Sequence, residues 1–326
     1  MEKLDVKDRK ILYELDIDSR QSFSQLGKKV GLHKDIVSLR VQKLQEKRII
    51  KNFYTQVCGN KLGYTYVKFY LTYQNVTPKI KQEIIDYLVQ NPYTLAVHSC
   101  GGHYDLCVCP WVENITNFST IWNNIIGKYK DYFSSQVFCV HNLQIKYKLI
   151  FLLDEKPDKK EERILSVDSS DYKKVEIDEL DKKILDLLAL NSRISTVEIA
   201  QKLKSNVTEI NSRVTALVKK GVIIRFTINI DWPKIGYEWY KADITLKKPE
   251  KRQQIIEYIE NNPNLIHRIA SLGYVDLELT FILNNAIELH QILEDLSLKF
   301  PDAIQNYKYF SIINTHKYFD IDFWNR

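Results

Sequence analysis

The chain is an internal duplication, and this feature constrains its fold more than any other. Residues 8–12 (DRKIL) return as residues 181–185 (DKKIL), 173 positions later, and the spacing falls to 171 in the second part of each copy. Other matching pairs are Ser19-Arg20 with Ser192-Arg193, Arg40-Val41 with Arg213-Val214, Gly63-Tyr64 with Gly236-Tyr237, Asn91-Pro92 with Asn262-Pro263, and Lys146-Tyr147 with Lys317-Tyr318. A solenoid repeat has roughly 20–50 residues. This repeat has the size of a whole protomer, so we predict a homodimer fused into one chain.

Composition is that of a globular protein. The 326 residues are 44% hydrophobic and 27% charged, as in ordinary soluble domains. No apolar run approaches the ~20 residues that span a bilayer, and the first residues lack the apolar core of a signal peptide. We therefore expect a cytoplasmic protein with no membrane partner. The five cysteines lie in the first copy alone, which favours reduced thiols over a disulfide framework.

Each copy opens with three predicted helices. Apolar residues recur with helical spacing in the first and third of these segments, and Ser22 and Ser195 are suitable N-caps for the short helix between them. A turn of three or four residues before the third helix is typical of a helix-turn-helix. The apolar positions are Ile11, Leu12, Leu15, Val37, Val41 and Leu44, repeated as Ile184, Leu185, Leu188, Ile210, Val214 and Leu217.

Basic charge is concentrated around the third helix of both copies. Residues 28–53 hold eight Lys and Arg against two acidic residues, and residues 201–226 hold six against one. The remainder differs between copies, because residues 177–326 have 20 of each sign, whereas residues 1–153 have 21 basic and 13 acidic residues. Clustered positive charge indicates a polyanionic partner.

Beyond the third helix the hydrophobic period changes to two, which predicts strands. The order βαββαβ in each copy predicts a ferredoxin-like sandwich and an α+β protein with two (winged) helix-turn-helix heads. The predicted domains are 1–60 and 177–233 (heads), 61–153 and 234–326 (sandwiches), and 154–176, a charged linker for which a surface helix is the alternative. We expect the sandwiches to pack about a pseudo-two-fold axis, because each sheet has an apolar face that needs its sister.

These motifs, in this order, resemble the Lrp/AsnC family of transcriptional regulators. The matching segments are LDVKDRKILYEL and IDELDKKILDLL, VSLRVQKLQEKRII and INSRVTALVKKGVI, and NKLGY and PKIGY. The resemblance covers nearly the whole chain outside the linker, twice. It implies double-stranded DNA as the partner, self-association of the chain, and an amino-acid effector bound between sandwich domains. We accordingly expect a sequence-specific regulator without a cofactor, and not an enzyme.

The third helix of each copy is the candidate nucleic-acid site. Residues at its N-terminus and on its outward face are those that reach base edges, while basic neighbours contact phosphate. Arg40 and Arg213 flank the apolar face, so phosphate contact and bracing of the helices remain equal alternatives. The candidate residues are His33, Lys34, Asp35, Ser38, Arg40, Gln42 and Lys43 in the first copy, and Asn206, Thr208, Asn211, Arg213 and Thr215 in the second.

The Gly-x-x-Asp segments are the candidate effector site. The resemblance places the effector near them, and a carboxylate suits a ligand ammonium; an Asp that caps a turn is the alternative. The candidate residues are Gly102, Tyr104, Asp105, Gly273 and Asp276. The surrounding segments, CGGHYD and SLGYVD, differ, so we expect two unequal pockets.

A metal site near residues 98–109 is a weaker hypothesis. His98, Cys100, His103, Cys107 and Cys109 are suitable zinc ligands by type. However, no Cys-x-x-Cys pair occurs, and the second copy lacks these residue types at the matching places. Buried cysteines that act as small apolar residues are the commoner case, so we expect no metal.

Two other functions stay open. Siroheme decarboxylases resemble the same two-domain unit and work as pairs of related protomers, but they tend to carry Asn-Leu-Trp-Phe where this chain has DLCV (105–108) and DLEL (276–279). An architectural protein that coats DNA through charge alone is the third reading, and salt dependence and sequence preference separate it from a regulator.

Overall fold

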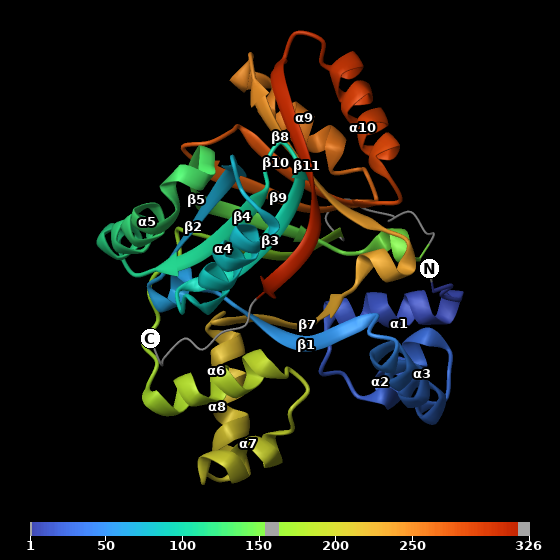
Figure 1. The fold of residues 1–326 in the computed structure, drawn as a ribbon. Coiled ribbons are helices and arrows are strands. Elements are labelled where there is room, and N and C mark those ends of the chain that lie inside the picture. The colour runs from blue at the N-terminus through green and yellow to red at the C-terminus, as the bar shows by residue number, and fades with distance from the viewer. Residues whose placement is uncertain (1, 154–162, 319–326) are drawn as a thin grey trace.

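The computed structural model describes residues 2–153 and 163–318. Two helical heads lie on the same side of a β-barrel, and helices cover the barrel's outer surface (Figure 1). The first head contains α1 (Val6–Ile17), α2 (Phe23–Val30) and α3 (Lys34–Glu46), and the second contains α6 (Glu179–Leu190), α7 (Thr196–Leu203) and α8 (Val207–Lys219). Both predicted helix-turn-helix units are therefore confirmed.

Local sequence signals set the ends of these helices. Asp5 and Asp178 cap α1 and α6 by accepting hydrogen bonds from the backbone N–H three residues later, as N-cap carboxylates do. Ser22 forms a reciprocal capping box with Gln25 at the start of α2. This helix ends at Gly31, whose φ of 69° lies in the left-handed region where glycine is favoured.

A two-stranded antiparallel ribbon joins the heads. β1 (Ile50–Val57) pairs with β7 (Ile223–Ile230), the matching strand of the other copy. Each first helix packs against the other copy's strand, α1 on β7 and α6 on β1. The two heads are thus related by a pseudo-two-fold axis, and each contacts the strand of the other copy, as in a dimer of two protomers.

Each copy contributes four strands and two helices to the barrel. The order along the sheet is β2-β4-β3-β11-β8-β10-β9-β5, and β5 returns to pair with β2, which closes the ring. The first copy supplies β2 (Thr65–Tyr73), α4 (Pro78–Gln90), β3 (Thr94–Gly102), β4 (Leu106–Val112), α5 (Ile115–Tyr129) and β5 (Phe133–Tyr147). The second supplies β8 (Glu238–Leu246), α9 (Arg252–Ile259), β9 (Leu265–Leu272), β10 (Leu277–Leu283), α10 (Ala286–Lys299) and β11 (Ile304–Tyr318). The βαββαβ order is confirmed in both.

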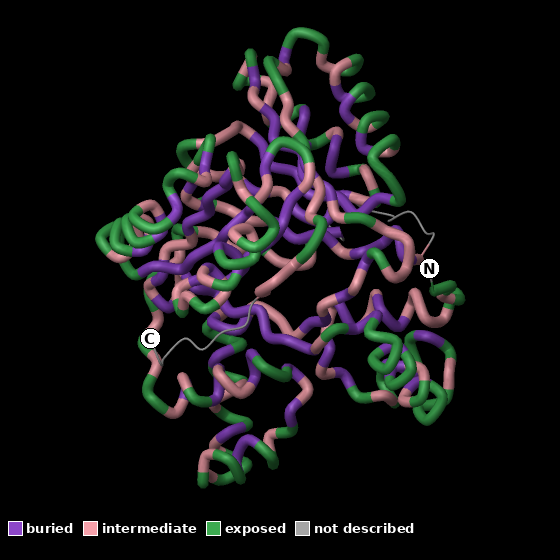
Figure 2. The backbone as a smooth tube through the Cα atoms, in the orientation of Figure 1, coloured by how far each residue is buried: buried purple, intermediate pink, exposed green. Residues whose placement is uncertain are grey.

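The two sandwiches join at their edges. β11 extends from β8 to β3 of the other copy, and β5 extends from β2 to β9. Side chains alternate along a strand, so Val67, Phe69 and Leu71 face the helices α4 and α5, whereas Lys68 and Tyr70 face inward. The buried positions follow the strands, and the exposed ones follow the outer helices (Figure 2).

This arrangement corrects the expected cause of pairing. The apolar face of each sheet is covered by the helices of its own copy, and the faces that the copies share inside the barrel carry buried Lys68, Lys241, Asp243 and Glu278. Backbone pairing at the sheet edges, the partly polar interior of the barrel and the apolar contacts of each head with the other copy therefore join the copies.

The predicted linker is partly a strand. Residues 154–162 lie outside the described residues, but Ile164–Ser169 forms β6 on the edge of β5. Arg163, at 1% exposure, donates to the carbonyls that follow α9, those of Glu260, Asn262, Pro263 and Leu265. The surface-helix alternative is thus wrong for the described part, because paired backbone and a buried guanidinium attach it to the barrel.

Candidate nucleic-acid interface and barrel cavity

The N-terminal turn of α3 and its outer face are open to solvent. His33, Lys34, Asp35, Gln42 and Lys43 are all exposed. His33 is the N-cap residue but makes no side-chain cap, and its Nδ1 lies 3.2 Å from Asp35 Oδ2. Gln42 Nε2 donates to Glu46 Oε1 at 2.8 Å. Ser38 is half-buried, which is less open than its helical phase predicts.

The matching helix α8 presents different chemistry. Asn206, Thr208, Asn211 and Thr215 are exposed. Asn206 Oδ1 caps the helix by accepting from Glu209 N at 2.7 Å, and Thr215 Oγ1 donates to the Asn211 carbonyl at 2.8 Å. Asn211 is exposed, and its side-chain amide can both donate to and accept from a base edge.

Arg40 and Arg213 brace the heads internally. Arg40 Nη1 donates to Asp5 at 2.8 Å and Asp8 at 2.7 Å, which joins α3 to the start of α1. Arg213 makes the same bridge to Asp178 at 2.7 Å and Asp181 at 3.0 Å. Of the two roles open in the sequence, the geometry favours bracing, because carboxylates already occupy both guanidinium groups.

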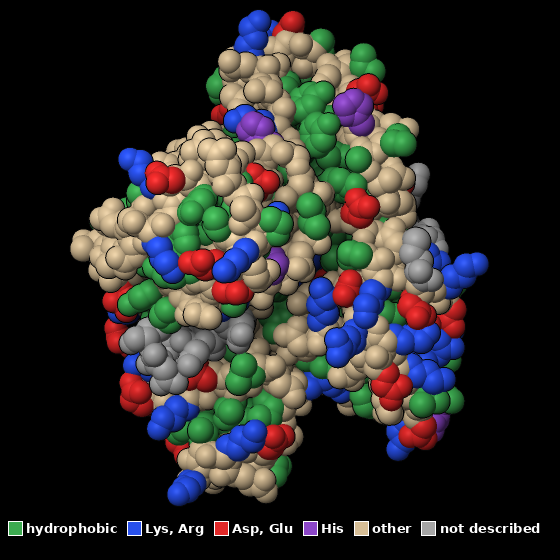
Figure 3. All heavy atoms as spheres, viewed as in Figure 1, with side chains coloured by type: hydrophobic (Ala, Val, Ile, Leu, Met, Phe, Trp, Pro, Cys, Tyr) green, Lys and Arg blue, Asp and Glu red, His purple; other side chains and the backbone are tan. Residues whose placement is uncertain are grey.

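Two exposed apolar residues on α3 were missed by the sequence analysis. Ile36 and Leu39 are 46% and 47% exposed, and the matching residues of α8 are Glu209 and Ser212. The signal was present in the helical phase, since both residues lie off the Val37, Val41 and Leu44 stripe. Figure 3 shows Lys and Arg side chains gathered, with acidic ones among them, over the head that contains α1–α3.

Matching Ser-Arg pairs of the two copies fix the relative orientation of the heads. The Ser19 and Ser192 hydroxyls, equivalent in the two copies, are 2.6 Å apart. Arg20 Nη1 donates to the carbonyls of Ser192 at 2.6 Å and Ile194 at 2.8 Å, and Arg193 Nη1 donates to the carbonyls of Ser19 and Gln21. The two heads, and with them α3 and α8, are therefore held in a defined relative orientation.

The Gly-x-x-Asp carboxylates hold the backbone of neighbouring strands. Asp105 Oδ2 accepts from Tyr73 N at 2.8 Å, and Asp276 Oδ2 accepts from Leu246 N at 2.7 Å. Gly102 and Gly273 are exposed and have φ of 117° and 81°, so they form the strand turns that glycine permits. The geometry thus favours a structural role over a ligand ammonium, although each carboxylate bonds to a neighbouring strand and not to its own turn.

The Tyr104 side chain is buried inside the barrel. Its ring stacks on Tyr70 at a centroid distance of 4.5 Å, and its hydroxyl lies 2.9 Å from the Tyr274 hydroxyl. Tyr274 donates to Asp243 Oδ2 at 2.5 Å. The chain from Tyr104 through Tyr274 to Asp243 joins one candidate effector segment to the other across the pseudo-two-fold axis.

The cysteine and histidine cluster does not converge on a metal. All five cysteines are buried and unbridged. Within residues 2–153 and 163–318, no three His, Cys, Asp or Glu side chains are placed to bind one ion. In the same residues, no helix is both long enough and apolar enough to cross a membrane.

The barrel interior holds an ionic cluster that the sequence analysis missed. Glu278 Oε2 accepts from Lys68 Nζ, from Lys241 Nζ at 3.2 Å and from the Tyr70 hydroxyl at 3.3 Å. Burial opposes ionisation of Glu278, but the ammonium groups of Lys68 and Lys241 hold its pKa well below the usual range. The repeat itself contains the signal, because Lys68 and Lys241 are 173 positions apart on matching strands.

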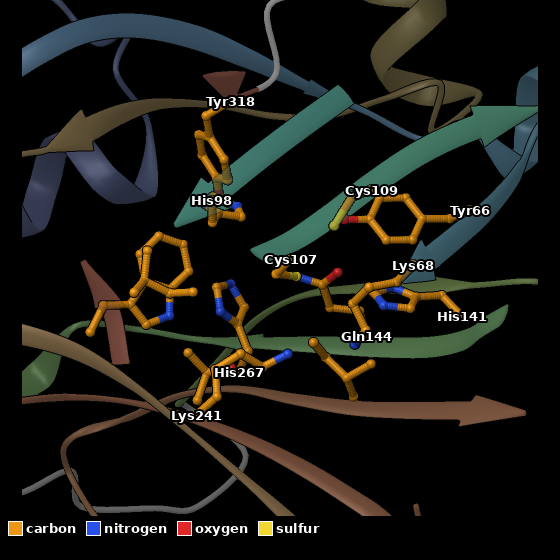
Figure 4. A pocket seen from close by; sticks show the side chains of 14 residues that line it. Tyr66, Lys68, His98, Cys107, Cys109, His141, Gln144, Lys241, His267 and Tyr318 are labelled. Carbon is orange, nitrogen blue, oxygen red and sulfur yellow. The ribbon is translucent and has the colours of Figure 1, made fainter. Parts of the chain in front are cut away.

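A cavity of about 70 Å³ lies beside this cluster (Figure 4). Lysines and neutral histidines point into it. Burial lowers the pKa of His98 to about 3, and burial also holds the pKa values of His141 and His267 well below normal. The lining side chains are Tyr66, Lys68, His98, Cys107, Cys109, His141, Gln144, Trp239, Lys241, His267, Ile269, Thr280, Ile312 and Tyr318.

Comparison with known proteins assigns both heads. Residues 4–45 match the AsnC-type helix-turn-helix domain, and residues 177–224 match a winged helix-turn-helix DNA-binding domain. The HTH-type transcriptional regulator LrpA of Pyrococcus abyssi is 37% identical over 125 residues, which are 38% of this chain and 87% of LrpA. The chain belongs to the Lrp/AsnC family.

Another relative is matched over a shorter stretch. An uncharacterized HTH-type transcriptional regulator of Pyrococcus furiosus is 45% identical over 85 residues, 26% of this chain. The chain spans 57% of that relative's length. The sequence comparisons support a DNA-binding regulator of the Lrp/AsnC type.

Among solved structures, the siroheme decarboxylase NirDL has the same architecture along its whole length. It superposes with a TM-score of 0.65 and 14% identity, covering 98% of this chain and 94% of NirDL. This overturns the expectation that the protein is not an enzyme, because an enzyme shares nearly the complete tandem fold. At 14% identity the likeness establishes the fold.

Proposed function

We propose that this chain is a transcriptional regulator whose two heads bind the unlike halves of one directional DNA site. The supporting observation is the combination of a fixed head-to-head contact with unlike recognition helices. The contact through Ser19 and Ser192 orients both heads, as in a dimer that binds a palindrome. The outward side chains differ at each matched position: Lys34 with Val207, Ile36 with Glu209, Ser38 with Asn211, Leu39 with Ser212, and Gln42 with Thr215.

The chemistry of these side chains suggests what each half-site contributes. Ile36 and Leu39 are exposed apolar groups beside Lys34, and such groups contact thymine methyls in the major groove. Asn211 offers an amide that pairs with adenine. Lys34 and Lys43 are exposed on the first head and form no salt bridge with another described residue, so that head supplies more phosphate contacts.

The effector and the assembly are further parts of the proposal. The resemblance implies an amino acid bound between sandwich domains and association of several chains. Asp105 and Asp276 already bond to backbone N–H groups, so such an effector would use the exposed turns around Gly102 and Gly273 between neighbouring molecules. Light scattering with and without amino acids measures whether they change the number of chains.

Salt-dependent DNA binding tests the proposal. Lys34→Ala with Lys43→Ala should weaken binding to every sequence and flatten the salt slope by about one unit per lost phosphate contact. The matched control is Lys79→Ala with Lys130→Ala, which removes the same charge from exposed sites beside the barrel. If both double variants bind DNA with equal affinity at low and at high salt, Lys34 and Lys43 of the first head do not contact phosphate.

Sequence preference separates a regulator from a DNA-coating protein. Fluorescence anisotropy on genomic fragments, including the region upstream of the protein's own gene, should reveal fragments bound far more tightly than random DNA at physiological salt. Specific binding is typically 10³ to 10⁷ tighter than non-specific binding. Equal affinity for all fragments would support the coating function.

A second candidate is catalysis inside the barrel on a siroheme-like substrate. The observation that favours it is the buried cluster of Lys68, Lys241, His98, His141 and His267 in a barrel that NirDL shares. NirDL has been solved with an iron-uroporphyrin III analogue. The cavity of about 70 Å³ must widen greatly to admit a macrocycle. Incubation with siroheme and mass spectrometry tests it, because each decarboxylation removes the mass of CO₂.

A further inference from the structure

Two ammonium groups lie in the lining of the barrel cavity. Lys68 and Lys241 enter it from matching strands, and Glu278 is the carboxylate that contacts both. All three side chains are buried. Among the described residues that line the cavity, none is acidic, so an occupant faces two ammonium groups and no carboxylate.

Several hydrogen-bond donors beside the cavity have no protein partner. An ammonium group has three donors; Lys241 uses two, on Glu278 and Tyr70, and Lys68 uses one on Glu278. Trp239 Nε1 and His141 Nε2 are buried without a partner among the described residues. Leaving such groups unpaired in a protein interior is unfavourable, which indicates a ligand that accepts several hydrogen bonds.

The cavity's size restricts that ligand to a small molecule. A volume of about 70 Å³ is room for roughly five water-sized probes at 10–15 Å³ each. A molecule of about six non-hydrogen atoms fits this space. An ammonium group on such a ligand would lie beside the ammonium groups of Lys68 and Lys241, and no carboxylate of the lining could pair with it. Electrostatic repulsion therefore excludes amino acids as ligands.

We propose that the barrel cavity binds a small carboxylate that lacks an ammonium group, such as a short 2-oxo acid, through Lys68, Lys241 and Trp239. The carboxylate oxygens accept the ammonium and indole protons that have no protein partner. The second buried carboxylate of the barrel, Asp243, accepts from Tyr274 and is not among the residues that line the cavity. Both copies supply an ammonium group for the same anion, which explains why a lysine is present at the matching position of each copy while the other inward residues differ. This inference is independent of DNA binding.

Calorimetric titration of the full chain with pyruvate tests the proposal. Lys241→Met keeps Glu278 paired with Lys68 and removes one ammonium group from the cavity lining, so pyruvate affinity should fall at least about tenfold, the value of one charge-assisted hydrogen bond. Glu278→Gln adds positive charge and should increase affinity. Trp239→Phe should weaken binding roughly fivefold, and Trp122→Phe, on the outer helix α5, is the control that should leave it unchanged.

L-Alanine, of the same size as pyruvate, tests the charge argument. We expect no measurable binding of L-alanine in the barrel. The proposal is overturned if pyruvate gives no heat at millimolar concentration, if L-alanine competes equally, or if Lys241→Met and Glu278→Gln shift pyruvate affinity in the same direction. A circular dichroism spectrum of each variant separates loss of binding from loss of fold.

Discussion

Asp243→Asn should stabilise the protein at alkaline pH and have little effect at acidic pH. Asp243 is 1% exposed inside the barrel; one carboxylate oxygen accepts from Tyr274, and the other has no partner among the described residues. Burial, with a smaller contribution from Glu278, raises its pKa to about 6, against the stabilising effect of Lys241. Asparagine keeps the hydrogen bond from Tyr274 and cannot ionise.

The magnitude follows from the shift in pKa. The folded protein binds the proton more tightly than the unfolded chain, whose Asp pKa is 3.8. The contribution of Asp243 to the free energy of unfolding is therefore fully present below pH 3.8 and is lost as pH rises through about 6. The loss amounts to about 3 kcal/mol at pH 8, at 1.36 kcal/mol per pKa unit, and Asp243→Asn recovers up to that amount.

Urea denaturation at pH 4.5 and pH 8, followed by tryptophan fluorescence, measures this difference. Asp302→Asn is the matched control, because Asp302 is 79% exposed and should show no pH-dependent effect. Glu278→Gln should act oppositely and destabilise at pH 8, since it leaves two buried ammonium groups with one fewer anion. An equal effect of Asp243→Asn at both pH values would refute the reasoning.

Other predictions concern the segment that joins the copies and the second head. Arg163→Met leaves the carbonyls after α9 unpaired and should lower the free energy of unfolding by about 2–4 kcal/mol, whereas the exposed Lys173→Met should change it little; equal midpoints in urea would contradict this. Arg213→Ala should speed hydrogen exchange in α6 and α8 through loss of the bridges to Asp178 and Asp181. The same variant should leave the salt slope of DNA binding unchanged, and a flatter slope would show that Arg213 contacts phosphate.

The fold was predictable because each local signal is repeated. The helix-turn-helix heads follow from apolar spacing and serine caps, and the βαββαβ order follows from the change of period, in both copies. The barrel closure was not predictable, because it depends on β5 and β11 continuing past their own sheets to pair with β9 and β3. Strand length alone does not specify a partner.

The sites were harder to predict than the elements. Outward residues of α3 and α8 follow from helical phase, and the structure places Lys34, Gln42 and Asn211 at the surface. Asp105 was a candidate ligand contact because of the family resemblance, and its bond to Tyr73 N could not be predicted because Tyr73 belongs to another strand. Lys68 and Lys241 were overlooked because strand alternation does not reveal whether an inward face meets solvent, apolar residues or a second buried charge.

Selection of binding sites from a random DNA library tests the central claim, that one chain reads two unlike half-sites. The protein should be used as a species of known stoichiometry, since self-association averages the two heads. We expect half-sites that differ in sequence and lie about one helical turn, roughly 34 Å, apart. Mutating one half should cost a different amount of affinity from mutating its mirror image. A strict palindrome with equal penalties in both halves would contradict this claim.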